Sequence, residues 1–179
     1  MKIRRVIVDL DPVPQSRAVI EAAVALAGHW EVELVGLFVE NIDLLHFAGL
    51  PFAAEVGTAL ASRRALNVAS MERLLRARAR AAEQTLASIA GRAAVRWTFR
   101  VARGSAAVEL LAAAADADLV IANVELVEAR EVPVRVRVIR AEDADALRAA
   151  LEAEPEGIVV LAGKDAARVG RTLWRLAAR

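Results

Sequence analysis

Residues 5–39 read RVIVDLDPVPQSRAVIEAAVALAGHWEVELVGLFV, and this stretch decides the fold. It opens inside a β-branched run over 3–8 that is typical of a buried parallel strand. Two prolines then impose a loop, an alanine-rich helix follows over 17–27, and a second apolar strand covers 32–39. A strand, a helix and a strand within about 35 residues predict a parallel pair joined by a right-handed crossover.

Glycines mark the predicted ends of the longer helices. Ser16 is the predicted N-cap of the helix over 17–27, and Gly28 its C′ residue. A longer helix is predicted over 63–90 and ends at Gly91. Its buried stripe comprises Leu66, Leu75, Leu86 and Ile89, and its exposed stripe comprises Arg73, Arg76 and Arg80.

The alternation of strands and helices continues down the chain. It predicts a third strand over 94–101, a helix over 106–115 that starts at Gly104-Ser105, and a fully apolar fourth strand over 118–122. Such an order predicts an α/β fold with an open, mainly parallel sheet and helices on both faces.

The last fifty residues extend this pattern. Residues 130–179 predict a β-α-β-α segment in which the strand over 132–139 alternates valine with arginine, as expected for one wet face at a sheet edge. We therefore divide the chain into a main domain over 1–129 and an extension over 130–179. The extension either continues the same sheet, which we favour, or packs as a small subdomain.

Composition narrows the function. The chain has 24 basic and 23 acidic residues, a net charge of +1, which argues against a polyanion binder, and its 4% aromatic content argues against stacking on single-stranded nucleic acid. The absence of cysteine excludes a disulfide framework and a thiolate metal site. No apolar stretch suits a signal peptide or a membrane span, so we expect a cytoplasmic protein that contacts neither membrane nor nucleic acid.

Four segments resemble the universal stress protein family, a group with a flavodoxin-like, Rossmann-like α/β fold. They match its first strand, first helix, second strand and the region of its third strand to fourth strand, in the family's order and spacing, over about two-thirds of the chain. The segments are Val6-Ile7-Val8-Asp9, Ser16-Arg17-Ala18, Leu37-Phe38-Val39-Glu40 and Val101-Ala102-Arg103-Gly104 with Ala117-Asp118-Leu119-Val120-Ile121.

The resemblance implies where an adenine nucleotide such as ATP or AMP would bind. Family members that bind nucleotide place adenosine against the acid ending strand one and the backbone of a valine ending strand two, which are Asp9 and Val39 here. Asp11 competes with Asp9 for this role. The family's phosphate loop, Gly-x2-Gly-x9-Gly-Ser/Thr, would begin at Asn123, yet no glycine lies between Gly104 and Gly157. The sequence therefore argues against a triphosphate site, and we expect no cofactor.

Two other features could hold an anion. Backbone N–H groups at Gly104-Ser105 could bind one at a helix start, although such caps are common. Arginines at positions 73, 76, 78 and 80 could grip a phosphate or an acidic partner, although a solvated helix face is the usual explanation.

The apolar connection over 44–52 is the most unusual segment of the sequence. If it is exposed, its large side chains mark a contact with a protein partner or a second copy; if it is folded back, it is a lid or a core filler. The side chains concerned are Leu44, Phe47, Leu50 and Phe52.

These observations favour a non-enzymatic, universal-stress-like protein that acts as a homodimer or by partner binding. The alternative is an adenine-nucleotide sensor that uses Asp9 and Val39. An enzyme ranks last, because no catalytic or metal-ligating set is present: His29 and His46 have no acid at ligand spacing, and no G-x-S-x-G elbow occurs.

Overall fold

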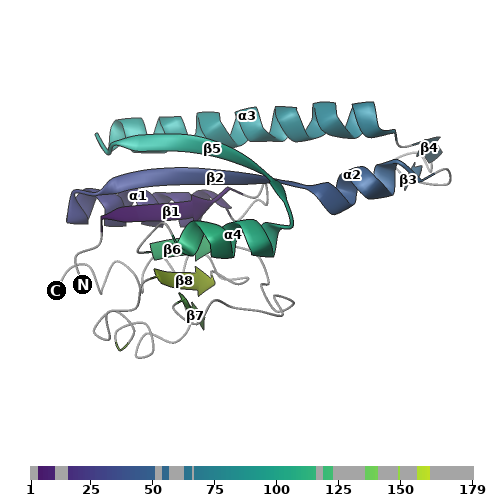
Figure 1. Cartoon of the computed structure of the whole chain (residues 1–179). Helices are drawn as coiled ribbons and strands as arrows, with labels where there is room; N and C mark the ends of the chain where they lie inside the picture. Colours follow the sequence, from purple (N-terminus) through teal and green to yellow (C-terminus); the bar gives the residue numbers. More distant parts are fainter. Residues whose placement is uncertain are drawn as a thin grey trace.

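The computed structural model describes residues 4–10, 16–50, 54–56, 63–65, 67–115, 119–122, 136–140, 149 and 157–161. Strands and helices alternate over residues 5–48 and 68–122 (Figure 1). The strands are β1 (Arg5–Asp9), β2 (Glu33–Asn41), β3 (Ala54–Val56), β4 (Arg63–Ala65), β5 (Trp97–Gly104), β6 (Leu119–Ala122), β7 (Val136–Arg140) and β8 (Gly157–Leu161). The helices are α1 (Ser16–Trp30), α2 (Ile42–Ala48), α3 (Val68–Arg92) and α4 (Ala106–Ala115).

Six strands form one sheet in the order β5-β2-β1-β6-β8-β7, and every neighbouring pair is parallel. The predicted α/β class with an open parallel sheet is therefore confirmed. Strands β7 and β8, which lie within residues 130–179, belong to this sheet, with β7 at its edge. The chain reverses its direction of travel across the sheet between β1 and β6, so their carboxyl ends flank a topological switch point.

Helices cover both faces of the sheet. On one face, α1 and α3 pack on alternate side chains of the strands, among them Val6, Val8 and Leu34. On the other, α4 packs on the intervening residues, among them Ile7 and Val35. Figure 1 shows α3 over β5 and β2, with α4 crossing the lower part of the sheet. Right-handed crossovers decide which face each helix covers. Across the sheet, the chain steps from β1 towards β5 through α1 and α3, and steps back towards β6 through α4, so α4 lies on the opposite face.

The predicted C-terminal ends of the helices over 17–27 and 63–90, placed at Gly28 and Gly91, are wrong. Helix α1 runs through Gly28 to Trp30, and α3 runs through Gly91 to Arg92. The left-handed residue that follows each helix is not the glycine but the residue three positions after it: Glu31 at φ 56° and Ala94 at φ 53°.

Hydrogen bonds explain these termini. After α1, the N–H of Val32 donates to the carbonyl of Ala27 at 3.0 Å; after α3, the N–H of Val95 donates to the carbonyl of Ala90 at 3.1 Å. This spacing is that of the Schellman motif, whose left-handed position usually holds glycine. The extension of α3 also shifts the third strand from the predicted 94–101 to 97–104, so Gly104 ends a strand instead of opening a turn.

The start of α3 also differs from the prediction. Residues 63–65 pair with residues 54–56 as the antiparallel strands β4 and β3. The helix starts at Val68, because the side chain of Asn67 accepts a hydrogen bond from the N–H of Ser70 at 2.8 Å and caps it. Leu75 and Leu86 are buried and the arginines of the exposed stripe are exposed, as predicted. Leu66 lies outside the described residues.

Candidate functional site

The carboxyl edge of the sheet brings together three of the five predicted ligand residues. Asp9 ends β1, Val39 lies near the end of β2, and Gly104 ends β5, and these strands are neighbours in the sheet. Side chains alternate between the two faces along a strand, which places all three residues on the face covered by α4. Val39 packs there on the core cluster that includes Ile7 and Val35. Asp11 and Asn123 lie outside the described residues.

Asp9 is buried at this edge, with 3% of its surface exposed. Within the part of the chain that the structure describes, every buried side-chain nitrogen or oxygen has a hydrogen-bond partner. Nothing about Asp9 therefore calls for a ligand. A structural role for the carboxylate accounts for its burial, whereas a ligand contact would need a path to solvent.

An acidic side chain occupies the predicted anion position at the start of α4. Glu109 lies in the first turn of the helix, and a Cβ atom added to Gly104 would lie 2.6 Å from its Oε1. A carboxylate near a helix N-terminus offsets the positive end of the helix dipole and repels a second anion. The arrangement disfavours phosphate at Gly104-Ser105. The sequence held a signal for this arrangement, because Glu109 falls in the first turn of the helix predicted over 106–115.

A second charged contact at this edge was not predicted. The buried carboxylate of Glu40 on β2 accepts a hydrogen bond from Arg103 Nε on β5 at 2.9 Å, and Arg103 Nη2 forms an ion pair with the same oxygen, Oε2, at 2.8 Å. The two residues are register partners in the parallel pair. Because they are 63 residues apart, no local pattern pointed to their pairing.

Metal binding has no support in the described residues. No group of three or more His, Asp or Glu side chains there could hold an ion. His29 and His46 are both exposed. None of the helices in the described ranges is long and apolar enough to cross a membrane.

The apolar connection forms helix α2, which the sequence analysis missed. The signals were Asn41, whose side chain accepts from the N–H of Asp43 at 2.8 Å as an N-cap, and Gly49, the C-cap residue. In Figure 1, α2 and the N-terminal half of α3 extend beyond the ends of the strands towards β3 and β4. We call α2 together with residues 68–80 of α3 the arm.

The arm has its own small core and an exposed apolar side. Leu45 and Ala48 of α2 pack with Met71 and Leu75 of α3. Within residues 44–50, one side of the helix therefore packs as a core filler and the other side is exposed, while the partner contact expected for an exposed side stays a prediction. The exposed large side chains of the arm and its connecting turn are Leu44 at 38%, Phe47 at 51%, Leu50 at 42%, Val68 at 41% and Leu74 at 43%. Phe52 lies outside the described residues.

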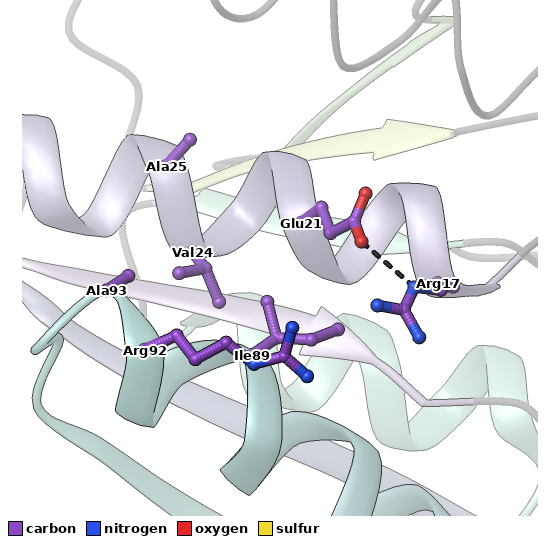
Figure 2. Close-up of a pocket in the computed structure, with 7 residues that line it drawn as sticks. All are labelled: Arg17, Glu21, Val24, Ala25, Ile89, Arg92 and Ala93. Atoms are coloured by element: carbon purple, nitrogen blue, oxygen red, sulfur yellow. Dashed lines mark hydrogen bonds and ion pairs between the residues drawn. The ribbon is translucent and has the colours of Figure 1, made fainter.

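A shallow groove lies between α1 and α3 (Figure 2) and has a volume of about 290 Å³. Val24 and Ile89 contribute apolar side chains, and Arg17 pairs with Glu21 at 3.0 Å along its rim. None of its lining residues was predicted as a site. The groove offers a polar ligand few partners, because Arg17 and Glu21 already pair with each other within α1 and because Val24 and Ile89 are apolar.

The six-stranded parallel sheet, its two helical layers and the switch point define a doubly wound α/β domain. Among solved structures, the fold is similar to that of a protein from the universal stress protein family from Burkholderia pseudomallei, with a TM-score of 0.53 and 15% identity over 89% of this chain and 96% of that chain. It is also similar to universal stress protein UspA from Lactobacillus plantarum, with a TM-score of 0.50 and 16% identity over 90% of this chain and 99% of that chain.

These likenesses confirm a universal-stress-protein-like fold for the chain, as the sequence resemblance implied. No protein-family model and no curated protein matches the sequence. Ligands and partners are therefore argued from the site of this chain alone.

Proposed function

We propose that this universal-stress-like protein is non-enzymatic, needs no cofactor and acts through protein–protein contact at the arm. The observation that carries the proposal is the exposure of Leu44, Phe47 and Leu50 on a helix whose other side is already packed. Apolar side chains gathered on one projecting element favour a surface that another protein covers. The absence of cysteine fits a cytoplasmic location.

The contact can be with a second copy or with a different protein. In a homodimer, the arm or an edge strand of the sheet would form the interface, since β5 and β7 are the two edges. Light scattering on a size-exclusion column, over a range of protein concentrations, measures self-association. A dimer that Phe47→Ser dissociates has its interface at the arm. Val108→Ser is the matched control, because Val108 is 61% exposed on α4. A monomer at every concentration would contradict the homodimer.

Adenine-nucleotide binding is the second candidate function. The observation in its favour is that Asp9, Val39 and Gly104 lie on one face of three neighbouring strands at the carboxyl edge, and that Asp9 ends the strand beside the switch point. Calorimetric titration of nucleotide-free protein with ATP, AMP and adenosine tests it. Micromolar binding that Asp9→Ala abolishes would promote this candidate. No heat from folded protein with any of the three would leave protein contact as the function.

A further inference from the structure

We infer that the arm binds an acidic, amphipathic polypeptide segment of a different protein. This inference rests on the proposed function, since it assigns the chemistry of the partner to the same surface. It begins from the uneven distribution of charge. The chain as a whole has a net charge of +1, whereas residues 67–115 contain eight arginines and three glutamates, a net charge of +5. Positive charge is therefore concentrated in α3 and in the segment 96–103 that includes most of β5, and four of these arginines lie on the arm.

The arginines of the arm lack acidic partners. Arginines elsewhere in the described residues form ion pairs with carboxylates of the fold; for example, Arg5 Nε lies 3.3 Å from Glu33 Oε2. On the arm, Arg73 bonds only to its own helix, at the Ala69 carbonyl and the Ser70 hydroxyl. Arg76, Arg78 and Arg80 make no ion pair with any residue in the described ranges. Their guanidinium groups are exposed and available to carboxylates from outside.

Apolar and basic side chains share this surface. Leu74 precedes Arg78 by four residues on α3, so these two exposed side chains are neighbours, whereas Arg73, Arg76 and Arg80 form a separate exposed stripe. Helix α2 packs beside this part of α3 and adds Leu44 and Phe47 on its outer side. The arm therefore offers apolar contact and bidentate carboxylate recognition together.

Charge and polarity select the occupant. A second copy packed face to face on this surface would bring Arg78 of each copy into one interface with no acidic partner from the described residues, which disfavours it. A nucleic acid would bind the arginines through its phosphates, which dominate the affinity of such complexes. It would leave the exposed leucines and Phe47 uncovered. An amphipathic helix with apolar anchors on one side and glutamates or aspartates on its flanks uses both kinds of side chain. We therefore assign the arm to a partner of that chemistry.

Fluorescence anisotropy with defined peptides tests the inference on the full chain. The probe is a helical peptide of about 18 residues with leucine at i, i+3, i+4 and i+7 and glutamate at the other positions. A second peptide replaces each glutamate by lysine, and a short DNA duplex serves as the competing polyanion. We expect the glutamate peptide to bind, the lysine peptide to bind at least about tenfold more weakly, and binding to weaken at high salt.

Two sets of variants locate the contact. Arg78→Glu, and separately Phe47→Ser, should each weaken binding of the glutamate peptide by about tenfold or more. Arg17→Glu and Val108→Ser are the controls, since both residues are exposed away from the arm. These exposed substitutions should leave the melting temperature nearly unchanged. Arg78→Ser repeats the test if the charge-reversal variant melts earlier.

The outcomes separate the two proposals. If Phe47→Ser weakens both peptides and charge reversal weakens neither, the arm is a contact surface but its partner is not acidic, and this inference fails alone. It also fails alone if Phe47→Ser dissociates a homodimer, because a second copy is then the occupant. If DNA displaces the peptide and Phe47→Ser has no effect, the arginines serve a nucleic acid and both proposals fail.

Discussion

Arg103 and Glu40 lie opposite each other in the register between β5 and β2, and the Arg103 Nη2 atom is 2.8 Å from Glu40 Oε2. The two residues differ in burial: Glu40 is 7% exposed, while the Arg103 side chain is 54% exposed. The pair joins a buried carboxylate to a solvated guanidinium at an edge strand. Removing one partner is therefore not equivalent to removing the other.

We expect Arg103→Ala to lower the free energy of unfolding by about 2 kcal/mol, because it leaves the Glu40 carboxylate buried without its cation. Glu40→Gln should cost about 1 kcal/mol, since the released guanidinium can be hydrated. Urea denaturation of both variants measures the difference. Arg100→Ala, at an exposed position of the same strand, is the control. Equal losses in the first two variants would contradict this account.

Ala94→Gly should stabilise the protein by about 0.5–1 kcal/mol. Ala94 has φ 53° at the end of α3, and glycine adopts this conformation without the clash that a Cβ atom causes. Ala77→Gly, at an exposed position inside α3, should instead destabilise by about 1 kcal/mol. Thermal melts of the two variants should move in opposite directions. A loss of stability in Ala94→Gly would show that this helix end is not strained.

Gly36→Ala should destabilise the protein by about 1–3 kcal/mol. A Cβ atom at this position of β2 would lie 2.4 Å from Leu86 Cδ2 and 2.6 Å from Leu10 Cδ1, so the core under α3 must shift. Gly91→Ala is the matched control, because a Cβ atom there meets nothing within 4 Å and alanine favours the helix. Chemical denaturation should show opposite signs for the two variants, and a neutral Gly36→Ala would mean that the core has room.

Asp9→Ala should lower the free energy of unfolding of the ligand-free protein by about 1–3 kcal/mol, because the carboxylate is buried and satisfied within the fold. Glu83→Ala, at an exposed position of α3, should change it by less than about 0.5 kcal/mol. The comparison is made by urea titration. An Asp9→Ala protein as stable as the wild type would favour a ligand role for this carboxylate.

The carboxyl-edge site was partly predictable. The family resemblance pointed to Asp9 and Val39 and the predicted helix start pointed to Gly104, and the structure places all three on one face of the sheet. The sequence could not predict that Glu109 would lie against Gly104, which depends on a side-chain conformation. Nor could it predict the pairing of Glu40 with Arg103, which depends on the register of two strands far apart in sequence.

The sequence by itself determined the order of the sheet strands and of the helices α1, α3 and α4, and several residues that face the core, because apolar periodicity is local and each period suits one kind of element. Leu75 and Leu86 were assigned to the buried stripe on that ground alone. The tertiary structure decided where α1 and α3 end and which side of residues 44–50 faces outward. Those outcomes depend on hydrogen bonds across a helix end and on which helix packs on which, and neither is encoded in a local window.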